Sequence, residues 1–567
     1  MSDSAGRWER ALRSRLWLPL SFVAPVVCGL IALHEAFSDA YVMPIDARVH
    51  VFWMQRFLDP SLFPHDLIAD YAQSVSPPGT AAFYRVLAWL GLNPLVAVKL
   101  VPLPIMLLTT WFTWRALMAI RVVPAAACLS TLLFNEAIWA HQDVASGTAR
   151  AFLYPPLSAL LYFLIVRKVR GAAISAFLLA LFYPPAGLIG VALLMTDLLV
   201  RRPPRAGRDY RFAAIGLAVA LVVLVPIGLK RSPYGPVLTA SVARTMPELG
   251  SRGDFEFFTA DGGRDWLYGS RAGAFALFES PLATAGMTAL TLLAILRRRL
   301  PLMREISPRW VVLLWLAIAS VAVYSAAHLV LFRLYHPGRY TMHTFRLLFA
   351  IAGGVSTISV LDALHRRRSK LVIPACCLVV GLVAAYPMYL SGVFGYPNTG
   401  YIHGRKTGVY EFLRRQPRDI TIATISAEAQ NIPSFAARSV LTGRAFALPW
   451  HVGYRQQTKQ RMIDLLRAQY SADPAEVLRV IQTYRIDFWL IDRDAFEPWY
   501  LPSQEWAQAG IDVQEETRRV EAGGVPVMRD LMTRCMAFED VYEIVVRADC
   551  AASVARGGTM RAAPRHP

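Results

Sequence analysis

The sequence is poor in charged residues for its length. Of its 567 residues, 17% are Asp, Glu, Lys or Arg, and 55% are hydrophobic. Average soluble domains carry about 25% charged residues, so this composition argues against a soluble enzyme of several domains. It excludes a disordered or fibrous chain as well, because such chains lack the apolar residues needed for a core.

Several sequence signatures are missing. The six cysteines show no Cys and His spacing typical of a zinc site. There is no Gly-rich ATP-binding loop, so a substrate would have to carry its own activation energy. Neither an internal repeat nor a low-complexity segment is evident. The first apolar run has no small-residue cleavage site and is followed by further apolar runs, so a cleavable signal peptide is not expected.

Long apolar runs are abundant. A membrane-spanning helix needs about 20 mostly apolar residues, and eleven segments qualify or come close. The Pro pair at 184–185 predicts a tight hairpin between two short spans rather than one long helix. The stretch 79–91 is too short to span and is typical of a helix lying in the membrane interface. The predicted spans are 16–35, 94–114, 122–140, 151–166, 172–184, 185–200, 212–229, 276–296, 310–330, 342–363 and 371–391.

The distribution of charge predicts the topology. With the N-terminus in the cytoplasm, the cytoplasmic segments hold 23 basic and 6 acidic residues, a net charge of +17 out of the total of +19. Every short cytoplasmic loop is then basic, as the positive-inside rule requires. The positive charge thus orients the bundle, and nucleic-acid binding finds no support. We expect a multi-pass protein of the bacterial inner membrane.

The tail after the last span is patterned like a soluble domain. We take residues 1–391 as the transmembrane module and 392–567 as a small α/β domain outside the membrane, in the periplasm. Segments 419–424 and 486–492 predict strands, and 456–470 and 474–484 predict helices. Cys535 and Cys550 lie in this domain, where an oxidising compartment permits a disulfide, but the sequence leaves their pairing open.

Candidate chemistry lies in the external loops. The long first loop (36–93) begins with Asp46 and carries Asp59, Asp66 and Asp70 further on; the second presents His141, Asp143 and Arg150. For each carboxylate, a solvated loop residue is the competing interpretation. A third external loop, 230–275, mixes Gly, Arg and aromatic residues, which suits either a mobile cover over a site or a flexible connector.

The last external loop is rich in basic and aromatic side chains. His336, Arg339, Tyr340, His343 and Arg346 all fall near the outer membrane face. Arginine at membrane depth is costly unless paired, which points to an anionic ligand. Its guanidinium matches phosphate oxygens well, while contact with lipid headgroups is the alternative. Carboxylates that deprotonate an acceptor, together with arginines that hold a phosphate leaving group, suit transfer of a group from a lipid phosphate.

This layout resembles the GT-C superfamily of integral membrane glycosyltransferases. Asp46 in PIDARVH matches the position of the superfamily's essential Asp after the first span, and His141 and Asp143 occupy the place of its second acidic motif. Arg339 in HPGRY lies where some members bind lipid phosphate. The sequence departs from the pattern in having Asp-Ala-Arg rather than an Asp-Glu pair in the first loop. It also has no WWDYG-type motif, so a peptide acceptor is not carried over. Among known branches, protein O-mannosyltransferases and aminoarabinose transferases are distantly similar.

The resemblance implies a set of roles. A polyprenyl-phosphate sugar would be the donor, with its phosphate held by Arg339 and by His336, Tyr340, Arg150 or Arg346. Asp46 would act as general base on the hydroxyl of an external glycan, lipid or protein acceptor, and the anomeric configuration would invert. Asp143 and His141 would orient the acceptor, or Asp46 and Asp143 would bind a divalent metal such as Mg or Mn. The alternatives are a transporter or flippase for a lipid-linked saccharide and a non-catalytic protein of envelope polysaccharide assembly.

Overall fold

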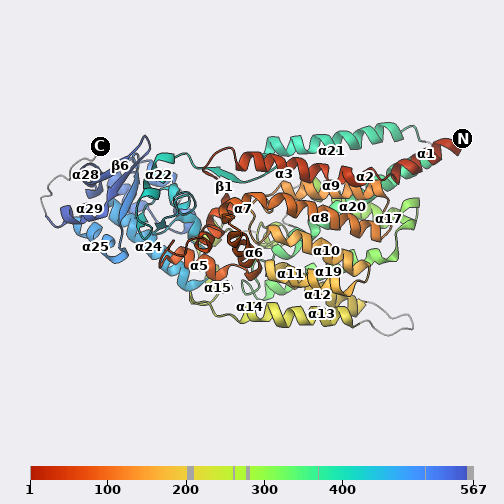
Figure 1. The fold of residues 1–567 in the computed structure, drawn as a ribbon, viewed down its shortest axis with the longest axis horizontal. Coiled ribbons are helices and arrows are strands. Elements are labelled where there is room, and N and C mark those ends of the chain that lie inside the picture. Colours follow the sequence, from red (N-terminus) through yellow and green to blue (C-terminus); the bar gives the residue numbers. More distant parts are fainter. Residues whose placement is uncertain are drawn as a thin grey trace.

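The computed structural model describes residues 2–200, 210–259, 262–275, 281–367, 369–504 and 506–557. A bundle of roughly parallel and antiparallel helices occupies one end of the long axis, and an α/β domain occupies the other (Figure 1). The chain is therefore a polytopic α-helical membrane protein with a small C-terminal α/β domain, as the sequence predicts. The helices α3 (Val23–Ala36) and α21 (Val372–Phe394) both appear toward the upper edge of the bundle in Figure 1.

Each of the eleven apolar segments contains helix in its described part; residues 276–280 of the segment 276–296 lie outside the described residues. Among the described residues, five helical stretches are long and apolar enough to cross a membrane: Trp17–Ala36, Pro94–Ala119, Arg211–Leu229, Pro308–Leu329 and Arg339–Arg366. The number of crossings stays a prediction, because several of the other helices are shorter than a full span. The helices are α2 (Trp17–Ser21), α3 (Val23–Ala36), α7 (Pro94–Leu100), α8 (Pro102–Ala119), α9 (Pro124–Trp139), α10 (Tyr154–Ile165), α11 (Val169–Phe182), α12 (Pro184–Val200), α13 (Arg211–Val219), α14 (Val225–Leu229), α17 (Pro281–Leu296), α19 (Val311–Leu329), α20 (Arg339–Arg366) and α21 (Val372–Phe394).

Proline marks several helix boundaries. Because proline lacks the amide hydrogen and clashes with the preceding turn, it is tolerated in the first turn of a helix. Helix α11 ends at Phe182 and α12 begins at Pro184, so the predicted hairpin is present. Helices α8 and α9 also have Pro in their first turn, at Pro102 and Pro124.

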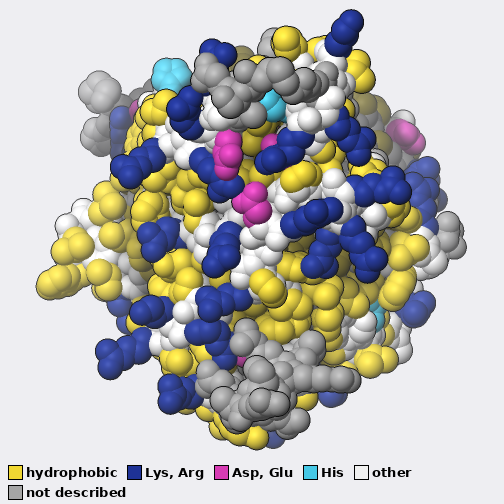
Figure 2. Space-filling model, turned by 90° about the vertical axis from the view of Figure 1, so that its right-hand side faces the viewer, with side chains coloured by type: hydrophobic (Ala, Val, Ile, Leu, Met, Phe, Trp, Pro, Cys, Tyr) yellow, Lys and Arg dark blue, Asp and Glu magenta, His cyan; other side chains and the backbone are white. Residues whose placement is uncertain are grey.

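The end of the bundle away from the α/β domain is strongly basic. Lys and Arg side chains cover this face with few acidic ones between them (Figure 2). Arg10, Arg121, Arg170 and Arg298 are exposed there, in segments predicted to be cytoplasmic. The N-terminal helix α1 (Ser2–Leu12) packs on this end, where the Trp8 indole donates to Asp362 at 3.2 Å.

The first loop is folded, not extended. It contains β1 (Val42–Pro44), α4 (Ile45–His50), a 3-10 helix at Phe52–Phe57, α5 (Leu67–Val75) and α6 (Pro78–Trp89). Asp66 caps α5 by accepting the amides of Ile68 and Ala69 at 2.8 and 3.0 Å, which is a structural role. Helix α6 corresponds to the predicted interfacial helix 79–91 and exposes Val86, Trp89 and Leu90. Strand β1 pairs antiparallel with β2 (Tyr401–His403), which follows the last apolar helix.

The C-terminal domain is built on a five-stranded sheet of order β4-β3-β5-β7-β6. Strands β4, β3 and β5 are parallel, whereas β7 is antiparallel to both β5 and β6. A disulfide joins Cys535 to Cys550, so the open question about this pair is settled. The strands are β3 (Thr421–Ala423), β4 (Ser439–Val440), β5 (Phe488–Asp492), β6 (Met536–Glu539) and β7 (Glu543–Arg547); the main helices are α22 (Thr407–Arg415), α24 (Val452–Tyr470), α25 (Pro474–Tyr484), α27 (Gln514–Glu521), α28 (Val527–Arg534) and α29 (Ala548–Ala555).

Candidate active site

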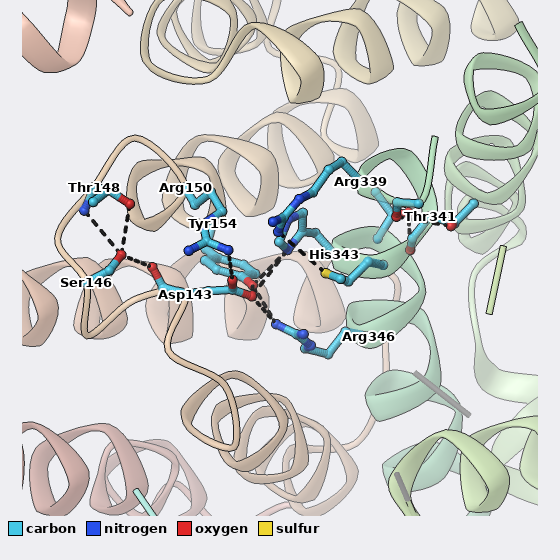
Figure 3. Close-up of polar contacts among 12 residues, drawn as sticks. Asp143, Ser146, Thr148, Arg150, Tyr154, Arg339, Thr341, His343 and Arg346 are labelled. Carbon is cyan, nitrogen blue, oxygen red and sulfur yellow. Dashed lines mark hydrogen bonds and ion pairs between the residues drawn. The ribbon is translucent and has the colours of Figure 1, made fainter. Parts of the chain in front are cut away.

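The predicted site residues come from three elements at the end of the bundle that faces the C-terminal domain. Asp46 is the second residue of α4. His141, Asp143 and Arg150 lie in the turn between α9 and α10, and α20 begins with Arg339. Figure 3 shows side chains from the second loop and from α20 pointing toward one another. The structure therefore gathers residues that are up to 300 positions apart in the chain.

Asp143 is the buried centre of this group. Its carboxylate accepts hydrogen bonds from Arg346 Nη1 at 2.9 Å and from the Tyr154 hydroxyl at 3.2 Å, and it pairs with Arg150 Nη1 at 3.2 Å (Figure 3). Its side chain is 6% exposed. Burial alone would raise the pKa of Asp143, but the surrounding arginines and His343 outweigh it and hold this pKa well below the usual range. Asp143 is therefore a permanent buried anion whose oxygens are already engaged.

Arg150 joins the two predicted carboxylates. Its Nη2 pairs with Asp46 Oδ2 while its Nη1 faces Asp143 Oδ1. Both negative charges raise the pKa of Arg150 against the opposing effect of burial, so the guanidinium is always charged. The Asp46 side chain is 29% exposed, far more than Asp143. Of the two carboxylates, Asp46 is the one that an external molecule can reach.

Arg339 lies beside this network without joining it. It is half-buried, its Nη1 lies 3.9 Å from Met342 Sδ, and no carboxylate within the described ranges pairs with it. Its charge reaches its neighbours: burial first, and then the positive charge of Arg339, lower the pKa of both Arg271 and His336. Arg339, Arg271, Arg150 and Arg346 thus bring four positive charges to the site, against the two negative charges of Asp46 and Asp143.

Three predicted phosphate-binding residues are turned inward. Arg346 is 2% exposed, and its Nη1 donates to Asp143 and, at 2.7 Å, to the Tyr154 hydroxyl, so it neither contacts headgroups nor reaches the site mouth. Tyr340 is 1% exposed and its hydroxyl donates to the carbonyl of Leu334. His336 is 3% exposed and packs edge-on against Trp450, with ring centroids 4.3 Å apart. Of the predicted phosphate-binding residues, Arg339 and Arg150 are only half-buried, and Arg150 is already paired with Asp46 and Asp143.

His141 is a neutral member of the group. Burial, and then the positive charge of Arg346, lower the pKa of His141 to about 4. At neutral pH its ring is uncharged and can exchange hydrogen bonds without adding charge.

A divalent metal does not fit this donor set. No group of three or more His, Cys, Asp or Glu side chains within the described ranges is arranged to bind an ion. Asp46 and Asp143, the two predicted ligands, are bridged by Arg150, and Asp143 also binds Arg346. A guanidinium occupies the position between the carboxylates where a shared cation would have to lie.

Sequence reasoning missed other residues at this site. Arg271 lies in the third external loop, and its Nη2 donates to the backbone carbonyl of Asp254 at 3.2 Å. Tyr154 opens α10 and its hydroxyl contacts Asp143, Arg346 and His343. Trp450 comes from the C-terminal domain. Arg271 belongs to the Arg- and Gly-rich loop that the sequence had drawn attention to, whereas nothing in the sequence pattern marked Tyr154 or Trp450.

No family model matches the chain, and no curated protein matches it. Among solved structures, the chain is similar to the apo form of the Archaeoglobus fulgidus oligosaccharyltransferase, with 12% identity over 86% of this chain and 71% of that chain and a TM-score of 0.48. It is also similar to the mycobacterial arabinofuranosyltransferase AftD, with 14% identity over 84% of this chain and a TM-score of 0.48; the match spans 37% of that longer protein.

Proposed function

We propose that this protein is a membrane glycosyltransferase that moves a sugar from a polyprenyl-phosphate-linked donor to an external acceptor. The observation that carries the proposal is the excess of positive charge beside a reachable carboxylate. Arg339 is partly exposed and has no carboxylate partner in the described chain. An arginine without a negatively charged partner near the membrane surface favours the binding of an anion. The phosphate group of a lipid is an anion that lies at the same level of the membrane.

Asp46 is the general base of this proposal. The acceptor hydroxyl oxygen attacks the anomeric carbon, its proton passes to the Asp46 carboxylate, and the bond from the anomeric carbon to the phosphate oxygen breaks. The electron pair leaves with the polyprenyl phosphate, and Arg339 and Arg271 stabilise the charge that develops there. Arg150 holds Asp46 through Oδ2, and Oδ1 has no hydrogen-bond partner within the described residues. Attack opposite the leaving phosphate inverts the configuration.

Asp143 has an electrostatic role in this scheme. Because its oxygens are engaged by Arg346, Tyr154 and Arg150, it keeps the two arginines in place rather than binding the acceptor. No step passes through a metal ion.

The site faces the outer side of the bacterial inner membrane in this proposal. The basic end of the bundle would lie in the cytoplasm, and the site and the C-terminal domain would lie in the periplasm. The disulfide between Cys535 and Cys550 supports this orientation, because such bonds persist in oxidising compartments.

Binding of undecaprenyl phosphate tests the role of Arg339. In lipid nanodiscs, we expect Arg339→Gln to weaken binding of this probe at least tenfold, since hydrogen bonds to charged groups contribute about 1.5–3 kcal/mol. Arg333→Gln is the matched control, because Arg333 is exposed in the same segment. Equal affinity of the Arg339 variant and the wild type would exclude this anion site.

Transfer from a panel of undecaprenyl-phosphate-linked sugars tests Asp46. We expect Asp46→Asn to lower the release of undecaprenyl phosphate by about 10²- to 10⁴-fold, the usual contribution of a general base. Asp59→Asn, in the same loop but paired with Arg418 of the C-terminal domain, is the control. Full turnover by the Asp46 variant would remove Asp46 from the mechanism.

A further inference from the structure

The short helix that carries Asp46 is held from two sides. Successive residues of an α-helix lie about 100° apart, so Asp46 and Arg48 point in nearly opposite directions from α4. Asp46 pairs with Arg150 on the bundle side. Arg48 is 5% exposed, and its Nη1 donates to the side-chain oxygen of Asn431 in the C-terminal domain.

Asn431 belongs to a buried polar network of the C-terminal domain. Its amide nitrogen donates to Glu428 Oε2 at 2.8 Å, and the Tyr410 hydroxyl donates to the same oxygen. Burial lowers the pKa of Arg48, and Glu428, Tyr410 and Asp46 act in the opposite direction. Arg48 is thus the only cation that the described residues of α4 contribute to this network. A neutral residue in its place would leave the Glu428 carboxylate without this positive charge.

A backbone connection reinforces the side-chain contact. Strand β1 leads directly into α4 and pairs with β2, and the Ile45 amide donates to the Gly400 carbonyl at 2.9 Å. The same segment touches the second loop, because the Asn398 amide donates to the Trp139 carbonyl at 2.7 Å. Gly400 has φ of +59°, and a Cβ at this position would collide with the side chain of Gln142, the neighbour of Asp143. Residues 398–403 therefore contact both loops that carry the two carboxylates.

We propose that the C-terminal domain is part of the catalytic arrangement. Through Arg48 and residues 398–403 it sets the position of Asp46 relative to Asp143 and to the bound donor. Arg48 and Gly400 are positioning residues, which act through Asp46. This inference rests on the proposed function, and it gives the C-terminal domain a role in catalysis.

Two variants of Arg48, together with one control variant, test the contact between the Arg48 side chain and the C-terminal domain. We expect Arg48→Met to lower kcat about ten- to a hundredfold, since a displacement of about 1 Å costs up to 10²-fold, while the affinity for undecaprenyl phosphate stays within twofold. Arg418→Met is the matched control, because Arg418 also joins the C-terminal domain to the first loop, at Asp59, but 60% of its side chain is exposed. Its kcat should stay within about threefold of wild type. Arg48→Lys, which keeps the charge, should recover part of the activity.

Glycine variants test the backbone contact. Gly395 and Gly400 both have positive φ, but a Cβ at Gly395 meets nothing within 4 Å. Gly395→Ala therefore reports the cost of the left-handed backbone conformation alone. We expect Gly400→Ala to lower kcat at least tenfold more than Gly395→Ala does, and Gln142→Ala to restore part of this loss when combined with Gly400→Ala.

Hydrogen exchange separates failure of this inference from failure of the proposed function. If the wild type binds undecaprenyl phosphate and turns over a donor, but Arg48→Met loses no more kcat than Arg418→Met, the positioning role is wrong. If no donor is turned over, the amides of residues 45–51 decide: they must exchange at least tenfold faster in Arg48→Met than in Arg418→Met. Equal exchange in the two variants would overturn the inference without reference to activity.

Discussion

At the scale of single residues, the site is governed by charge in a confined space. Asp143 stays ionised because the guanidinium groups and His343 around it outweigh the effect of its burial, whereas burial first, and then the positive charge of Arg346, keep His141 neutral. The sequence placed His141 and Asp143 in one loop, but their different protonation behaviour depends on Arg346 and Arg339, which arrive from a distant helix. Residue types and loop positions were predictable from the sequence; which arginine is buried and which is accessible was not, because helix rotation decides it.

The suppressed protonation of His141 predicts a pH dependence of stability. An unfolded His takes up its proton near pH 6.5, whereas His141 in the folded protein does so only near pH 4. Between these values the unfolded chain binds more protons, so stability falls as the pH falls through this window. We expect His141→Gln to reduce the loss of apparent Tm between pH 7 and pH 5 in detergent. The corresponding variant of His65, which is exposed, should keep the wild-type loss, and an unchanged loss in His141→Gln would contradict the assignment.

At the scale of elements, the third external loop differs from its expected form. From the sequence, residues 230–275 could form either a mobile cover over a site or a flexible connector. The structure has α15 (Ala240–Ala243), a 3-10 turn at Pro247–Leu249 and α16 (Gly262–Tyr268) there, and backbone bonds fasten it to the C-terminal domain. The Leu238 amide donates to Trp450 at 3.0 Å, and the Val452 amide donates to Pro236 at 3.1 Å. Loop composition could not reveal these partners, which lie about 200 positions further along the chain.

A bidentate ion pair anchors the middle of this loop. Arg444 donates to both oxygens of Asp254, at 2.9 and 2.8 Å. We expect Asp254→Ala to speed trypsin cleavage after the exposed Arg252 by about tenfold, because a loss of about 1.4 kcal/mol of local stability opens the segment tenfold more often. Cleavage is followed by mass spectrometry of the fragments. Asp512→Ala, a change at an exposed residue of the C-terminal domain, should leave the rate unchanged. A wild-type rate in Asp254→Ala would mean that other contacts hold the loop.

At the scale of the whole molecule, local and long-range features differ in how well the sequence predicts them. Each apolar run forms a helix because it can satisfy its own backbone hydrogen bonds, so all eleven segments were found. The helices from Val452 and Pro474 and the strands at 421–423 and 488–492 were found for similar reasons. The pairing of β1 with β2, and the hairpin of β6 and β7, were not. The pairing of β1 with β2 depends on how the bundle brings Val42 beside His403, which no local pattern records.

The orientation that we propose for the whole molecule rests on its two unlike ends. One end is covered by arginines in short loops, and the other carries a disulfide-bonded domain (Figure 2). Both features favour the same orientation for independent reasons: basic loops are retained in the cytoplasm, and disulfides form outside it. A protein inserted the other way would have to translocate these basic loops and keep the cystine in a reducing compartment.

Cysteine labelling in intact spheroplasts tests this orientation. Lys370 and Ser503 are exposed at the basic end and in the C-terminal domain, respectively. We expect a membrane-impermeant maleimide to label Ser503→Cys in intact spheroplasts, and Lys370→Cys only after permeabilisation. The wild type measures the background from its free cysteines, of which Cys377 is exposed. Labelling of Lys370→Cys before permeabilisation would reverse the topology. It would also place Asp46 and Arg339 on the cytoplasmic side, where the donor would have to be used before it crosses the membrane.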